Sequence, residues 1–178
     1  SYWLICTINS DRLSSEISEL IKDTVKEHGG HYSSPLGVVD LTVALHYAYD
    51  SPKDKLIWDV GHQAYAHKIL TGRRDLFKTI RQKDGISGFL KRDESPHDII
   101  GAGHASTSIS SSLGVAHARD INEDDFNVVT AEGLKGSFKV IENIIKAFEI
   151  GLYPKVNVLC EPQLGKRNLY PNTSRLYK

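Results

Sequence analysis

Apolar residues recur at helical spacing near the start of the chain, at Leu13, Ile17, Leu20, Ile21 and Val25. Steps of three or four residues predict an amphipathic helix over residues 11–28. Ser10 is of a residue type that caps helix N-termini, and a glycine pair such as 29–30 is typical of a helix end. We therefore expect the first helix to start after Ser10 and to end before the glycines.

A second helix is predicted with Ser34 at its cap and Pro35 in its first turn. Its apolar face would consist of Leu36, Val39, Val43 and Tyr47. Pro52 then breaks the chain, and the segment KLIWDV (55–60) has the short apolar run of a buried strand.

The rest of the chain alternates between short apolar runs and helical patterns. The sequence predicts a helical stretch at 64–70, a polar, glycine-punctuated segment at 71–103, a helix with a small-residue face at 106–120, an exposed acidic turn at 122–125, an apolar run at 126–129, a helix at 138–148 and a last strand at 156–159. Helices that alternate with short strands favour an α/β layered fold.

Composition limits the classes of function. The 178 residues carry 22 basic and 22 acidic side chains, so no global field favours nucleic acid or a membrane surface. The apolar opening, Tyr2 to Cys6, is too short for a signal peptide or a membrane span. The two cysteines, Cys6 and Cys160, lie far apart in the sequence, which favours a reducing compartment, cytoplasmic or organellar.

Two Gly-His pairs follow predicted strand or loop ends, Gly61-His62 and Gly103-His104. Each combines a backbone that a ligand can approach, a helix N-terminus and a histidine donor, a combination that suits a phosphate. The alternative for each is a tight turn followed by a capping or core histidine. His31, after a glycine pair, is by itself a loop histidine near a helix cap.

Taken together, these segments resemble a known family. The run from Gly29 reads GGHYSSPLGVVDLTVALHYAYDSPKDKLIWDVGHQAYAHKILTGRRDLFKTIRQKDGISGF, and GHASTSISSSLGVAHARD follows from Gly103. Over roughly residues 11–120 the chain is similar to the opening domain of the 1-deoxy-D-xylulose-5-phosphate synthase family. The resemblance implies that residues 1–125 form a truncated thiamine-diphosphate-binding, transketolase-like domain, with helices around a short parallel sheet.

The resemblance also implies a reaction and a set of site residues. Members condense pyruvate with glyceraldehyde 3-phosphate, with loss of carbon dioxide, using thiamine diphosphate as electron sink, in isoprenoid precursor and thiamine synthesis. By position, His62 and the triplet Gly103, His104 and Ala105 match cofactor-binding residues. His31 matches a histidine near the reacting centre, a proton donor or substrate contact. Ala105 stands where the family has a serine.

The magnesium ligands of the family are not predicted here. They come from a Gly-Asp-Gly segment and a later asparagine, whereas this chain reads FNVVTAEGLKGSFKV and has no aspartate after Asp125. Glu132 before Gly133 is at most a relic. The family's activating glutamate, supplied by a second domain, has no counterpart either. We therefore expect the chain to be inactive alone.

Residues 126–178 form a divergent tail of uncertain origin. Residues 132–174, above all CEPQLGKRNLYP, resemble the end of a bacterial family of aminopeptidase-like zinc proteins. No histidine follows His117, so no catalytic zinc set is predicted.

Three functions stay open at this point: a transferase or part of one, a non-catalytic binding or assembly module derived from it, and a peptidase-related chain. The expected partners are the two small substrates and a second identical chain, without nucleic acid or membrane; a plant chain would be plastid-located. A basic cluster is read as a solvated helix face: Arg73, Arg74, Lys78, Arg81 and Lys83.

Overall fold

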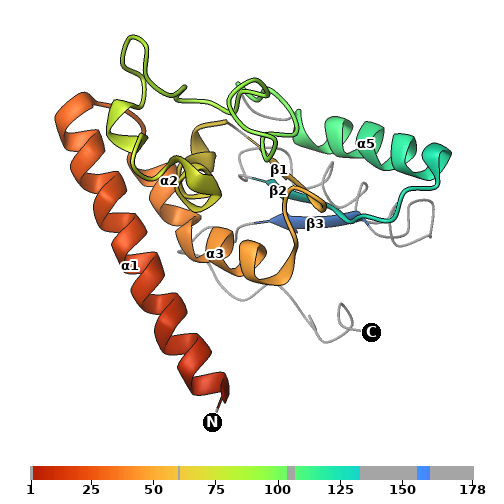
Figure 1. Cartoon of the computed structure of the whole chain (residues 1–178), viewed down its shortest axis with the longest axis horizontal. Coiled ribbons are helices and arrows are strands. Elements are labelled where there is room, and N and C mark those ends of the chain that lie inside the picture. Colours follow the sequence, from red (N-terminus) through yellow and green to blue (C-terminus); the bar gives the residue numbers. More distant parts are fainter. Residues whose placement is uncertain (1, 60, 104–106, 133–155, 161–178) are drawn as a thin grey trace.

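The computed structural model describes residues 2–59, 61–103, 107–132 and 156–160. They form an α/β arrangement in which helices lie on both sides of a small sheet (Figure 1). In chain order the elements are α1 (Tyr2–His28), α2 (Ser33–Gly37), α3 (Val39–Ala48), β1 (Lys55–Trp58), η1 (Gly61–Ala64), α4 (Tyr65–Lys68), η2 (Ile69–Arg73), η3 (Phe77–Thr79), α5 (Ser108–Asn122), β2 (Val128–Glu132) and β3 (Val156–Cys160). The α/β class predicted from the sequence is confirmed.

The sheet is parallel, in the order β1-β2-β3. Lys55 of β1 pairs with Val128 of β2, and Val128 pairs with Val156 of β3. The strands predicted near 55–60 and 156–159 are confirmed, and the apolar run at 126–129 leads into β2. Both β2 and β3 lie beyond the boundary predicted at residue 125, yet β2 pairs along β1. The helix predicted at 138–148 lies outside the described residues.

Alternating side chains cover the two faces of the sheet. On one face, Leu45 of α3 joins a buried cluster with Leu56, Trp58, Val129 and Ala131. On the other face, Ile57 and Val128 pack against Ala116 of α5. This period-two alternation places α3 and α5 on opposite sides, as Figure 1 shows. The carboxyl ends of β1 and β2 therefore lie at the same edge of the sheet, between α3 on one face and α5 on the other.

Helix α1 forms an outer layer over α3. Its predicted stripe is buried at Ile17, Ile21 and Val25, which share a cluster with residues of α3. The helix ends at His28, and Gly29 adopts φ +73°, as the glycine pair predicted. The predicted start was wrong: α1 begins at Tyr2 and contains Ser10. No glycine or proline separates Tyr2 from Ser10, and serine costs little inside a helix.

The second predicted helix is divided in two. α2 starts at Ser33, after Tyr32 and not after a Ser34 cap, and the chain leaves helical geometry at Val38 before α3. Val38 is fully buried, and its carbonyl accepts hydrogen bonds from the backbone N–H and the hydroxyl of Thr42. Helix α3 therefore starts after a residue that is fixed by burial and by these two hydrogen bonds.

The apolar face predicted through Tyr47 was also wrong at that residue. Tyr47 is 79% exposed, whereas Val39 and Val43 are buried. Leu45 points to the sheet, and Tyr47 lies two residues later, on the opposite side of the last turn.

Helix α5 and the turn after it match the prediction closely. α5 ends where Glu123 adopts the left-handed conformation, and residues 122–125 are exposed. Among the described residues, no helix is both long and apolar enough to cross a membrane.

Candidate functional site

Two predicted site histidines, His31 and His62, are brought into contact. His31 follows Gly30 in the exposed turn between α1 and α2, and His62 is the second residue of η1. Their rings lie parallel, with centroids 3.8 Å apart and an interplanar angle of 8°. Because β1 ends at Trp58, His62 lies just beyond the carboxyl end of a parallel strand, where α/β proteins bind ligands.

The two predicted Gly-His junctions also meet through their backbones. The Gly61 N–H donates to the Gly103 carbonyl, with 3.0 Å between nitrogen and oxygen. A Cβ on Gly61 would lie 2.0 Å from the Ala102 carbonyl oxygen, so only glycine fits there. Gly103 is exposed, and a Cβ on it would meet nothing within 4 Å. Its backbone is open to a ligand. His104 and Ala105 lie outside the described residues.

A third segment, which carries Arg81, lies beside the turn that contains Gly30 and His31. Gly30 has φ +144°, and a Cβ there would lie 3.3 Å from the Tyr65 hydroxyl and 3.6 Å from Nη1 of Arg81. Arg81 itself has φ +65°, which is rare for a residue with a side chain. Sequence reasoning placed Arg81 on a solvated helix face; it is exposed, but it lies in a turn and its guanidinium lies beside the His31 turn.

The helical segment that starts at Gly61 ends at Arg73, where buried charged side chains hold it in place. Arg73 donates from Nη1 and Nη2 to the two carboxylate oxygens of Asp98, at 2.8 Å each, and from Nη1 to Glu94 at 3.0 Å. Lys68 donates to Glu94, and His67 Nε2 lies 3.5 Å from Asp98. We call this group, His67, Lys68, Arg73, Glu94 and Asp98, the Asp98 network.

The pKa values in the Asp98 network show how its charges are held. Burial favours the neutral acid at Asp98, but the neighbouring His67 ring and hydrogen bonds from Arg73 and the Lys91 backbone hold its pKa well below the usual range. At Glu94, the hydrogen bond from Lys68 likewise overcomes burial and lowers the pKa. Burial lowers the pKa of Lys68, opposed by Glu94. The carboxylates therefore stay charged because they are paired.

A second histidine pair joins this network to α3. His46 Nε2 and His67 Nδ1 are 2.9 Å apart, a hydrogen bond in which one ring donates and the other accepts. Burial lowers the pKa of His46 to about 4, and the neighbouring His67 and His97 add to the shift. Burial also lowers the pKa of His67 despite the nearby Asp98 carboxylate. Both rings therefore favour the neutral form.

Sequence reasoning missed the Asp98 network. The prediction of a solvated face was wrong for Arg73, whose side chain is 6% exposed because it is paired with two carboxylates. Glu94 and Asp98 lie 21 and 25 residues away from Arg73 in the sequence. No local sequence pattern connects these three residues. The sequence shows only a run of charged residues in a segment rich in turns, and that run does not indicate which charges pair.

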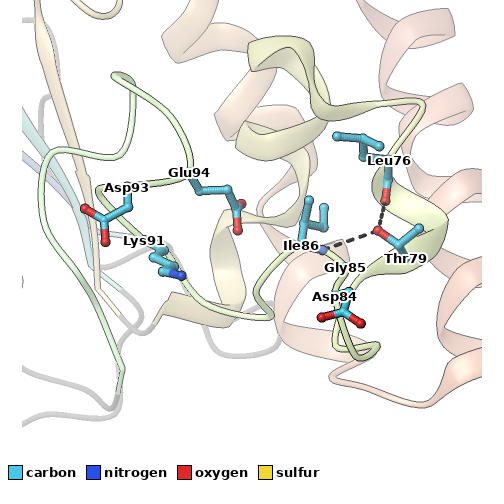
Figure 2. Close-up of a pocket in the computed structure, with 8 residues that line it drawn as sticks. All are labelled: Leu76, Thr79, Asp84, Gly85, Ile86, Lys91, Asp93 and Glu94. Atoms are coloured by element: carbon cyan, nitrogen blue, oxygen red, sulfur yellow. Dashed lines mark hydrogen bonds between the residues drawn. The ribbon is translucent and has the colours of Figure 1, made fainter.

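A shallow cavity of about 270 Å³ lies at a different place, lined by Leu76, Thr79, Asp84, Gly85, Ile86, Lys91, Asp93 and Glu94. Figure 2 shows the Thr79 hydroxyl bonded to the Leu76 carbonyl and the Ile86 N–H, with Glu94 and Lys91 across from them. Neither His31 nor His62 lines it. Glu94 of this cavity already accepts hydrogen bonds from Lys68 and Arg73.

Within the part of the chain that the structure describes, no three histidine, cysteine or acidic side chains converge as metal ligands would. Glu132 is the last residue of β2, and residues 133–155 lie outside the described ranges.

Comparison with known proteins identifies the family. The family model described as 1-deoxy-D-xylulose-5-phosphate synthase matches residues 6–137. The enzyme of that name from Dehalococcoides mccartyi is 57% identical over 136 residues, which are 74% of this chain and 22% of the relative. Those from Syntrophus aciditrophicus and Caldanaerobacter subterraneus are 58% and 57% identical over 121 and 122 residues, each covering 68% of this chain.

The helices around a short parallel sheet are thus those of a truncated thiamine-diphosphate-binding domain. More specifically, the chain belongs to the 1-deoxy-D-xylulose-5-phosphate synthase family. It spans about a fifth of the length of the curated relatives that it matches: 22%, 19% and 20% for these three.

Proposed function

We propose that this chain contributes one side of the thiamine-diphosphate site of a synthase that condenses pyruvate with glyceraldehyde 3-phosphate. The stacked His31–His62 pair, beside the Gly61–Gly103 hydrogen bond, is the observation that supports it. When bound, thiamine diphosphate supplies the electron sink for decarboxylating a 2-oxo acid.

The roles of the residues follow from their places. Gly103 offers an open backbone at the approach to α5, whose N-terminus presents N–H groups suited to a diphosphate. His62 would border the cofactor; by the family match, His104 and Ala105 would also belong to the cofactor-binding residues. His31, stacked on His62 and exposed, would face the substrate and donate or accept a proton from a ring nitrogen. These assignments are proposals.

Turnover would need more than these residues. No aspartate follows Asp125, and the described residues contain no converging metal ligands. We therefore propose that the chain by itself does not turn over pyruvate. A different chain, one that carries metal ligands and the activating glutamate, would have to complete the pocket.

The test is calorimetric titration of the purified chain with thiamine diphosphate, with and without magnesium, followed by an assay for carbon dioxide release from pyruvate. We expect binding that His62→Ala weakens, without measurable carbon dioxide release. Absence of binding under both conditions would overturn the cofactor-site proposal and favour a non-catalytic assembly module. Release of carbon dioxide by the chain would overturn the proposed inactivity.

A further inference from the structure

We propose that Asp98 is a positioning residue that, through the buried Asp98 network, holds the segment carrying Gly61 and His62 in register with Gly103. The functional meaning of that register rests on the function proposed above. The structural part of the inference rests only on the contacts among the described residues.

The ion pairs of the Asp98 network run between two segments of the chain. The nitrogen-bearing side chains of the network, His67, Lys68 and Arg73, lie on the continuous segment that begins at Gly61 and carries His62. Both acceptors, Glu94 and Asp98, lie on the segment that leads to Gly103. The network therefore joins the segment that begins at Gly61 to the segment that ends at Gly103.

The same carboxylates also organise their own segment. Asp98 accepts from the backbone N–H of Lys91 at 3.0 Å, and Glu94 accepts from that of Ser87 at 2.8 Å. Each carboxylate thus closes a loop of its own chain while it binds a cation of the other segment. Removing the charge of Asp98 would therefore weaken its link to the other segment, even where an acceptor for the Lys91 N–H is kept.

A short path leads from Asp98 to the site. Asp98 lies five positions before Gly103, whose carbonyl accepts a hydrogen bond from Gly61. The intervening Ala102 is buried, and its carbonyl oxygen occupies the space where a Gly61 side chain would be. A shift of the segment at Asp98 would therefore displace Gly103 and weaken its hydrogen bond with Gly61.

Energetics favour a positional role over a purely stabilising one. The side chains of Lys68 and Asp98 are 0% exposed, and burying such charges costs desolvation that their pairing only partly offsets. Packed apolar residues would stabilise this region as well or better. Fixed, directional contacts such as the two-pronged Arg73–Asp98 pair define one relative placement of two segments, which apolar packing does less strictly.

The test compares Asp98→Asn with Asp54→Asn by amide hydrogen exchange. Asparagine keeps an acceptor for the Lys91 N–H and removes the charge. Asp54 is the matched control, because it is also buried and accepts from the backbone of Asp50 and Asn127, away from the network.

With Asp98→Asn, we expect the Gly61 amide to exchange at least about tenfold faster, as local opening predicts, while the Lys55 and Asp59 amides in the sheet change less than about twofold. Asp54→Asn should speed exchange at Asn127 and leave Gly61 unchanged. Equal acceleration at Gly61 and in the sheet, or acceleration of Gly61 by the control, would overturn the proposal. If Asp98→Asn does not fold, Arg73→Lys, which keeps the charge and loses the fork, carries the same comparison.

Titration with thiamine diphosphate separates this inference from the proposed function. If the unmodified chain binds, Asp98→Asn should weaken binding at least about tenfold and Asp54→Asn less than about twofold, a difference that reflects preorganisation. Unchanged affinity in Asp98→Asn would overturn the positioning role. If the unmodified chain does not bind, the proposed function fails, and the exchange comparison alone decides the role of Asp98.

Discussion

Among the described residues, the histidine pairs His31–His62 and His46–His67 are built differently. The His31–His62 rings touch face to face, 3.8 Å apart, at an exposed turn. The His46–His67 rings are tilted by 32° and share a hydrogen bond of 2.9 Å, with His67 fully buried. Stacking engages the ring faces, whereas the buried pair commits one nitrogen of each ring. The first arrangement suits a site that meets ligands, and the second suits a fixed core.

The largest expected effect breaks the buried pair. His67→Ala should lower the free energy of unfolding by about 3 kcal/mol, because it leaves a cavity and removes the hydrogen-bond partner of His46. His62→Ala, the matched change in the stacked pair, should cost less than about 1 kcal/mol. Denaturant unfolding followed by circular dichroism measures both. Equal losses would mean that the two pairs do not differ as described.

The next effect concerns the two junction glycines. Gly61→Ala should lower the free energy of unfolding by about 2 kcal/mol, since the new methyl group would meet the Ala102 backbone. Gly103→Ala should change it by less than about 0.5 kcal/mol, because nothing lies within contact distance. Thermal and denaturant unfolding would show the contrast. A Gly103→Ala loss as large as that of Gly61→Ala would contradict the geometry.

The buried pair should also make stability depend on pH. The folded-state pKa of His46, about 4, lies below its ordinary value of 6.5, so the unfolded chain binds this proton first as pH falls. Stability from this group is complete above about pH 7 and is lost between 6.5 and about 4, by at most about 1.4 kcal/mol per pH unit for each proton.

Unfolding measured from pH 7 to 5 isolates this effect from Glu94 and Asp98. Their pKa values are also depressed, and their contributions are lost only at lower pH. His46→Gln should flatten the decline. An unchanged decline in that variant would assign it to other groups.

The smallest expected effect lies in the stacked pair. His31→Ala should change the free energy of unfolding by less than about 0.5 kcal/mol, because the residue is exposed. Under the proposed function, the variant should retain cofactor binding. In an enzyme with the complete pocket, it should reduce turnover, which an assay of the corresponding histidine in a full-length relative would test. A marked loss of stability would instead make His31 part of the core.

The sequence by itself determined the local elements and the family. Helical spacing identified the stripe of α1, the glycine pair marked its end, and short apolar runs located the strands, because these features depend on neighbouring residues. It misplaced the start of α1 at Ser10 and missed the break at Val38. A cap residue only permits a helix start, and the break depends on the burial of Val38. The motif matches in the sequence also pointed to His31 and His62.

Only the tertiary structure decided which of these residues meet. The stacking of His31 on His62, the Gly61–Gly103 hydrogen bond and the burial of Arg73 against Asp98 all join segments more than 20 residues apart. Local propensity cannot reveal such contacts, because a buried charge and a solvated one have the same sequence signature until folding brings its partner to it.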